Sequence, residues 1–163
     1  MAANGFIALQ GAVSALDFLN GRTTALEAEW QAKTAAGNPQ PKTTYLMLLT
    51  QVVIDAQTDM TTLVGIEAAG TGYARQPIPW GAASTSSRQS ANTDLVQFGP
   101  FNDPTGLAAP VTGAALVTRM TSSAGQPTGL ALMAWNLASA ITTAQNQALQ
   151  LAAGSLTMTL AVS

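Results

Sequence analysis

The start of the chain carries hydrophobic residues at helical spacing. Phe6, Leu9, Val13 and Leu16 recur every three or four positions, which places them on one stripe of a helix. Asn20 and the glycine after it are a typical stop for such a helix. We therefore predict a first helix with an apolar stripe near the N-terminus.

A second helix is predicted directly after the first. Thr24 and Glu27 have the spacing of a capping box, in which each side chain accepts a hydrogen bond from a backbone amide of the first turn. The helix would cover residues 25–36 and end at Gly37. Residues 1–41 are therefore expected to form an N-terminal helical arm.

After residue 41 the pattern becomes that of β-strands. Residues 44–54 (TYLMLLTQVVI) are rich in β-branched, aromatic and aliphatic residues, as strands buried on both faces are. Residues 155–162 (SLTMTLAV) alternate between apolar and polar, which is the strand period. Further strands are predicted at 73–80, where Pro77 and Pro79 favour a sheet edge, and at 94–98, 114–120, 130–137 and 148–152.

These short strands, separated by Gly, Pro, Ser and Asn turns, are typical of an antiparallel β-sandwich. We expect a mainly β protein in which residues 42–163 form one compact sandwich, jelly-roll or immunoglobulin-like, after the helical arm. The alternative is a helix at 139–151, whose Ala, Gln and Leu content suits one. Residues 82–91 (AASTSSRQSA) are of low complexity, and we predict an exposed loop there.

Charge is scarce in the chain. Of 163 residues, 9% are charged, against about 25% in ordinary soluble proteins. No residue after Arg119 carries a charge. A surface with so little charge is weakly protected against self-association, and interfaces are poor in charge at their centres. We therefore expect neighbouring subunits to cover part of this protein.

The composition disfavours several functions. Without histidine or cysteine, the chain lacks the commonest general base, thiol nucleophiles and the usual zinc ligands. Six basic residues and a net charge of −2 do not form a phosphate-binding patch. No apolar stretch approaches the roughly 20 residues of a membrane span, and no secretory signal is evident. We expect no cofactor, metal, nucleic acid or membrane partner.

Two carboxylate arrangements are candidate sites. Asp55 and Asp59 have the spacing of calcium-loop ligands, but the required glycine and the final glutamate are missing, so a polar turn is favoured. Glu27 and Glu29 lie two positions apart on a helix and face different directions, which favours capping and solvation.

The tryptophans allow a carbohydrate-binding hypothesis. Trp30, Trp80 and Trp135 would be sugar platforms, with Asp94 and Asp103 as a carboxylate pair. Packing in a core or an interface is the favoured reading of these tryptophans.

One group of residues is the candidate assembly interface: Phe6, Leu9, Val13, Leu16, Trp30 and Arg75. The apolar stripe would either dock on the sheet of its own chain or bundle with copies of itself. Arg75, between Tyr73 and Trp80, would stack on an aromatic ring or bridge to a neighbouring subunit; a solvated strand arginine is the alternative.

Short segments along the chain resemble one family. They are TYLMLLT (44–50), GTGYARQ (70–76) running to Trp80-Gly81-Ala82, an Asn92 segment leading to VQFGP (96–100), and the ending LAAGSLTMTL (151–160). This order is similar to that of small structural proteins of tailed bacteriophages, labelled tail fibre or minor structural proteins. The second helix and the stretch 104–110 are not part of the resemblance.

The resemblance implies a virion structural protein with a β-sandwich and no enzymatic activity. We expect a capsid decoration protein that binds at capsomer junctions of the head, made in the host cytoplasm. Its partners would be the major capsid protein and copies of itself, as a trimer. The alternatives are a tail or fibre component and a carbohydrate-binding receptor module.

Overall fold

A computed structural model describes residues 4–34, 43–53, 59–84, 86, 88–120 and 129–159, except the side chains of residues 4–6 and 32–34. The fold is mainly β, with antiparallel strands, and this confirms the predicted class. Five strands form one sheet in the order β1-β7-β6-β2-β3. They are β1 (Asn4–Ile7), β2 (Thr44–Leu49), β3 (Gln76–Ile78), β6 (Val111–Val117) and β7 (Ala131–Ile141).

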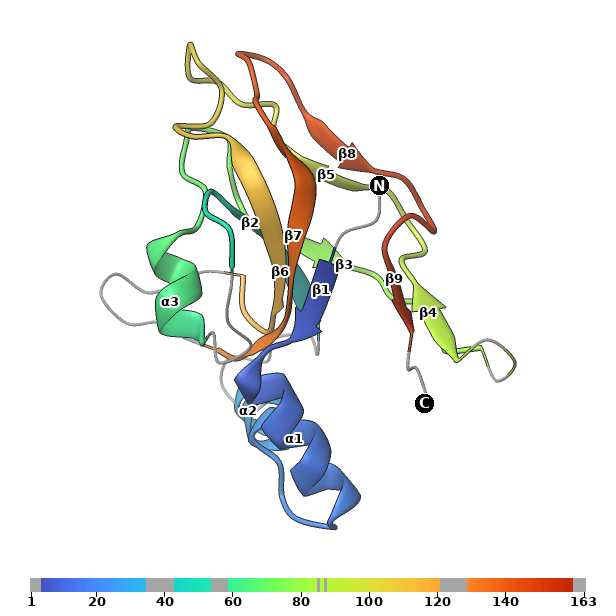
Figure 1. Ribbon diagram of the computed structural model, residues 1–163. Coiled ribbons are helices and arrows are strands. Elements are labelled where there is room, and N and C mark those ends of the chain that lie inside the picture. The colour runs from blue at the N-terminus through green and yellow to red at the C-terminus, as the bar shows by residue number, and fades with distance from the viewer. Residues whose placement is uncertain are drawn as a thin grey trace.

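Two short ribbons and three helices complete the described structure. The ribbons pair β4 (Gln89–Ala91) with β9 (Thr157–Thr159), and β5 (Val96–Phe98) with β8 (Leu149–Leu151). The helices are α1 (Leu9–Leu19), α2 (Ala25–Thr34) and α3 (Met60–Gly65). In Figure 1, α3 lies on one side of the five-stranded sheet and the ribbons lie on the other, while α1 and α2 project from one end.

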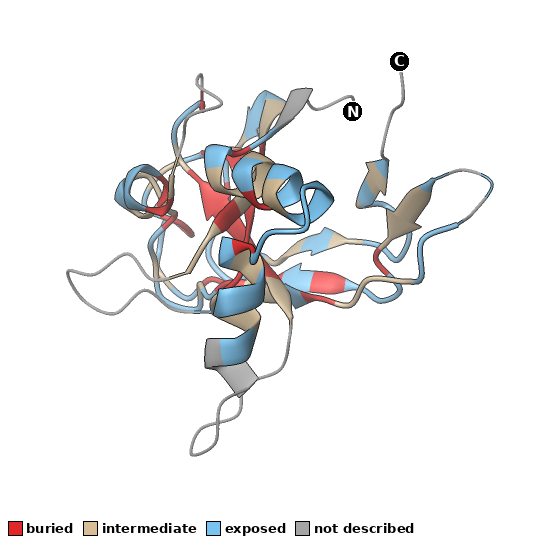
Figure 2. Cartoon of the chain, turned by 90° about the horizontal axis from the view of Figure 1, so that it is seen from below, coloured by how far each residue is buried: buried red, intermediate tan, exposed pale blue. Residues whose placement is uncertain are grey.

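Both faces of the five-stranded sheet are buried. On one face, Met47 and Leu49 of β2 pack with Met60 and Leu63 of α3. On the other face, residues of β2 and β6 pack against Val96, Phe98, Phe101 and Leu107 in the second layer. Buried residues gather in the middle of the molecule, and the outer surfaces of the helices are exposed (Figure 2). Two-sided burial explains why the sequence of β2 is apolar at every position after Thr44.

All seven predicted strand regions contain a strand, with shifted ends. The first, β2, stops at Leu49, and the proline-containing 73–80 region supplies the edge strand β3. The alternative helix at 139–151 is wrong, because β7 continues to Ile141 and β8 pairs with β5. Residue 54 and residues 160–162 of the predicted strands lie outside the described residues.

Three elements differ from the predictions. Phe6 lies in β1, where it is paired with Ala134 of β7, so α1 begins only at Leu9. The helix α3 was not predicted; its N-cap is Asp59, whose side chain accepts a hydrogen bond from the amide of Thr62. The ribbon strand β4 lies in the region predicted as a loop, whose described residues 82–84, 86 and 88 are exposed.

The capping box of the second helix is confirmed. The amide of Thr24 donates to Oε2 of Glu27 at 2.8 Å, and the amide of Glu27 donates to Oγ1 of Thr24 at 2.9 Å. The helix runs over Ala25–Thr34, and residues 35 and 36 of the predicted helix lie outside the described residues.

The side chain of Asn92 connects two segments of the second layer by hydrogen bonds. Its buried side-chain amide donates to the carbonyls of Asp94 and Ala152, and its Oδ1 accepts from the amide of Leu156. Its backbone carbonyl also accepts from the amide of Gly154. One side chain therefore joins the segment between β4 and β5 to the segment between β8 and β9.

We predict that Asn92→Ala lowers the free energy of unfolding by about 2–4 kcal/mol, because it removes three hydrogen bonds of a buried side chain and takes this partner from the amide of Leu156. Urea titration followed by circular dichroism measures the change. The control is Asn102→Ala, at an exposed asparagine, where the change should stay within about 0.5 kcal/mol. Equal stability of the two variants would contradict the role given to Asn92.

Candidate assembly surface

The helix α1 packs its small residues inward. A Cβ atom added to Gly11 would collide with the carbonyl oxygen of Leu132, so the backbone of α1 lies directly against the start of β7. Ser14 is buried, and Oε1 of Gln10 accepts a hydrogen bond from the amide of Ala131 at 2.7 Å. The close approach requires glycine at position 11.

The large apolar residues of α1 point outward as a consequence. At 100° per residue, Leu9, Val13 and Leu16 lie on the side of the helix opposite Gly11 and Ser14. All three are exposed, Leu16 to 60%. We call these three residues the α1 stripe. Of the two possibilities left open by the sequence, docking on the sheet of the same chain is therefore wrong for the stripe.

More exposed apolar residues lie close to the stripe along the chain. Ile7 precedes α1, and Phe18 and Leu19 form its last turn; Leu19 is 78% exposed. Exposed apolar side chains that gather on one element are candidates for contact with another protein. The end of the molecule formed by α1 is thus the first candidate surface for contact with another protein.

The remaining predicted interface residues lie elsewhere. The backbone of Phe6 belongs to β1, and its side chain lies outside the described part of the structure. Trp30 is half-buried on α2. Arg75 is only 2% exposed, so the solvated alternative is wrong and this side chain lies in the interior of the subunit. We therefore leave Arg75 out of the candidate surface.

The guanidinium of Arg75 bonds within its own subunit. Nε donates to Oε1 of Glu67 at 2.8 Å, and the second terminal nitrogen donates to Oε2 at 2.7 Å. The other terminal nitrogen donates to the backbone carbonyl of Arg119 at 3.0 Å. This bidentate geometry is the strongest form of the arginine–carboxylate pair.

Tyr73 extends the network into the core. Its hydroxyl donates to Glu67 at 3.0 Å and accepts from the amide of Leu48 in β2 at 3.1 Å. Its ring stacks on Phe98, with centroids 6.2 Å apart. Burial, with the adjacent Glu67 charge, raises the pKa of Tyr73 far above its ordinary value, so the hydroxyl stays protonated.

A second ion pair fixes α2 to the sheet. Arg119 donates from Nε to Oε1 of Glu29 at 2.6 Å and from a terminal nitrogen to Oε2 at 2.9 Å. Thr118 adds a hydroxyl bond to Oε1 at 3.1 Å. The Glu29 bonds raise the pKa of Arg119. Glu29, expected to be a solvating residue, instead joins the helical arm to the end of β6.

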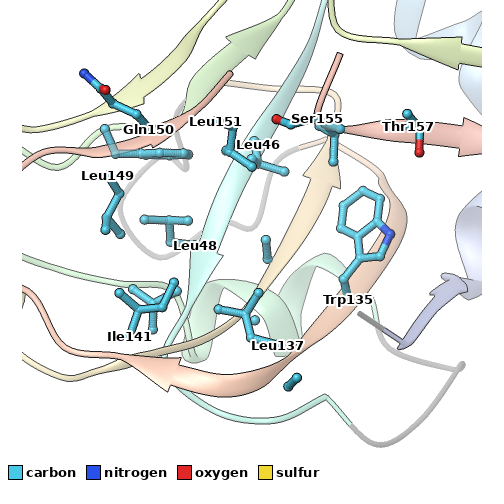
Figure 3. Close-up of a pocket in the computed structure, with 16 residues that line it drawn as sticks. Leu46, Leu48, Trp135, Leu137, Ile141, Leu149, Gln150, Leu151, Ser155 and Thr157 are labelled. Atoms are coloured by element: carbon cyan, nitrogen blue, oxygen red, sulfur yellow. The ribbon is translucent and has the colours of Figure 1, made fainter. Parts of the chain in front are cut away.

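An apolar groove lies between the two layers of the sandwich. It has a volume of about 400 Å³ and is lined by residues of β2, β5, β6, β7, β8 and the start of β9. Figure 3 shows Leu137 and Ile141 of β7 on one side and Leu149 and Leu151 of β8 on the other. Polar lining is confined to exposed residues: Gln150, Ser155 and Thr157. None of the described residues in the lining is charged.

The residues of the carbohydrate hypothesis do not line this groove together. Trp135 is in the lining, but Trp30 and Trp80 are not. Trp80 packs against the core, and its indole nitrogen donates to Oγ1 of Thr44 at 2.8 Å. Packing, the favoured reading, accounts for Trp80.

The proposed carboxylates have local structural partners. Asp94 accepts from the hydroxyl of Thr93, and Asp103 accepts from the amide of Thr71, a bond that lowers the pKa of Asp103. Both contacts join residues that lie in loops. Neither aspartate is in the groove lining.

Asp59 of the calcium-loop candidate caps α3, and Asp55 lies outside the described residues. The amide of Thr62, and then its hydroxyl, hold the pKa of Asp59 below the ordinary value. The ionised Asp59 cap therefore contributes stability at pH values above the ordinary pKa of aspartate. This contribution is lost as the pH falls through the lowered pKa of Asp59 in the folded protein.

Over the part of the chain that the structure describes, no cluster of three or more His, Cys, Asp or Glu side chains has the arrangement of a metal site. In the same residues, no helix has the length and apolar character needed to cross a bilayer.

The described structure is thus a mainly β subunit whose helix α1 leaves large apolar side chains exposed. A comparison with protein families matches residues 24–159 to the family described as Podophage GP4 fiber I protein gp80. The match spans most of the chain, and the chain belongs to this family of phage structural proteins. The resemblance found in the sequence is thereby confirmed, and the protein has a structural role in a bacteriophage virion.

The matched span includes the second helix and residues 104–110, which the resemblance had left out. It begins at Thr24, so β1 and α1 precede it. Comparisons with curated proteins and with solved structures find no match.

We predict that Arg119→Ala loosens α2 because Glu29, whose side chain is nearly buried, loses its bidentate partner. Backbone amides of α2 should exchange about tenfold faster in hydrogen–deuterium exchange mass spectrometry, equivalent to about 1.4 kcal/mol of local stability. Arg22→Ala is the control, because Arg22 forms an exposed ion pair with Asp17 at 3.5 Å. Unchanged exchange in Arg119→Ala would show that α2 is held by other contacts.

Proposed function

We propose that this chain is a non-enzymatic structural subunit of a virion fibre and that it assembles with copies of itself. The outward α1 stripe is the observation that carries the proposal. The helix turns Gly11 and Ser14 toward its own sheet and exposes Leu9, Val13 and Leu16, so its own subunit does not cover its large apolar side chains. The hydrophobic effect then favours a second subunit on that surface.

The scarcity of charge supports the same conclusion. The only charged residue within α1 is Asp17, and it is paired with Arg22. A partner on the stripe would therefore leave no charge buried without a counter-ion, which is the usual obstacle to covering a protein surface. Closed cyclic assemblies are common among homo-oligomers, and we propose a trimer, as expected from the sequence.

The candidate locations of the protein in the virion are the head and a fibre. The sequence led us to expect decoration of the head, bound to the major capsid protein, whereas the family description names a fibre. We propose the fibre for this reason. Immunogold labelling of purified particles tests the location: gold on fibres supports it, and gold spread over the head surface contradicts it.

We predict that the double variant Leu9→Asp, Val13→Asp is monomeric and absent from particles, because covering the stripe would bury two carboxylates per copy without a counter-ion. Its far-ultraviolet circular dichroism should match the wild type, since both residues are exposed. Light scattering gives the mass, and quantitative mass spectrometry of purified particles gives the copy number.

The control for this variant is Val52→Asp, Leu95→Asp, which places two carboxylates at equally exposed apolar residues outside α1. This control should assemble normally. Normal assembly of the Leu9, Val13 variant would show that the α1 stripe is not the contact surface.

A further inference from the structure

We propose that the α1 stripe of one copy inserts into the apolar groove between β7 and β8 of a second copy. This inference rests on the proposed function, and it specifies which two surfaces meet. The stripe is an apolar projection, and the groove is an apolar hollow. They belong to different elements of the subunit: α1 projects from one end, whereas β7 and β8 face each other above it in Figure 1.

The size of the groove fits the side chains of the stripe. An apolar cavity of about 150 Å³ holds one benzene molecule, so 400 Å³ holds two or three large apolar side chains. Leu9, Val13 and Leu16 project from one face of a helix at the spacing with which amphipathic helices enter apolar grooves.

Charge also favours a second copy as the occupant. The described residues of the groove lining include no charged side chain, so a partner that brings a charge into the groove would lose solvation without compensation. The α1 stripe brings none. Its exposed apolar residues and the half-buried leucines of the groove would be covered in the same contact.

The contact would be heterologous, because the two surfaces that meet are different. A heterologous contact either closes into a ring, such as a trimer, or continues into an open filament. Stripe-to-stripe packing around a symmetry axis is the rival arrangement, and it would leave the groove empty.

Cysteine cross-linking separates these arrangements, because the natural chain has no cysteine. Leu16→Cys places a thiol on the stripe, and Ala138→Cys places one at an exposed residue of the groove lining. The two variants are mixed in equal amounts and treated with a short bismaleimide. Mass spectrometry of the cross-linked peptides then identifies the joined residues.

We expect cross-links between Cys variants of positions 16 and 138 to exceed, several-fold, those formed when Ala82→Cys replaces Ala138→Cys. Ala82 is an exposed alanine outside the groove and provides the matched control. Cross-links only between two copies of Leu16→Cys would overturn the proposal in favour of stripe-to-stripe packing. Absence of the mixed cross-link would also overturn it.

The result is independent of the location in the virion. If gold labels the fibres but the mixed cross-link is absent, this docking mode is wrong and the proposed function stands. The mixed cross-link with gold on the head keeps the docking mode and removes the fibre.

Discussion

The guanidinium of Arg75 carries its charge where almost no water reaches it, so protein groups must compensate the lost solvation. Both oxygens of Glu67 and the carbonyl of Arg119 do so. Arg119 in turn holds Glu29 of α2, and α2 contacts α1. The loop after α3, the end of β6 and the helical arm are thereby linked in one series of contacts. The direction in which α1 presents its stripe depends on this series as well as on its own contact with β7.

The features that the sequence predicted correctly are those whose cause is local. The capping box of α2 needs only two residues three positions apart, and the edge position of β3 follows from its proline. The apolar run of β2 indicates burial on both faces, whichever elements of the chain cover those faces. The mainly β class could be predicted because each strand pattern is local. The division of the second layer into two separate ribbons could not, because it depends on which strands pair.

The features that were missed depend on residues far apart in the chain. Phe6 fits a helical stripe, but pairing with β7 fixes it in a strand. Arg75 finds its partners eight residues before it and forty-four after it, separations that no motif encodes. The groove exists only where β7 and β8 come together. The stripe could be predicted from its spacing, but its outward direction is set by the contact of Gly11 with Leu132.

The helix α1 turns Gly11 and Ser14 toward its own sheet and its large apolar side chains toward solvent. Its own subunit therefore does not bury the α1 stripe. Under the proposed function, burial of Leu9, Val13 and Leu16 by a neighbour would contribute to association rather than to the stability of the monomer. If that neighbour supplies a groove, each copy gives one surface and receives another. An open row of copies then always keeps one uncovered stripe and one empty groove at its ends. Such a row must close on itself or be completed by a different virion protein, because uncovered apolar surface continues to attract partners.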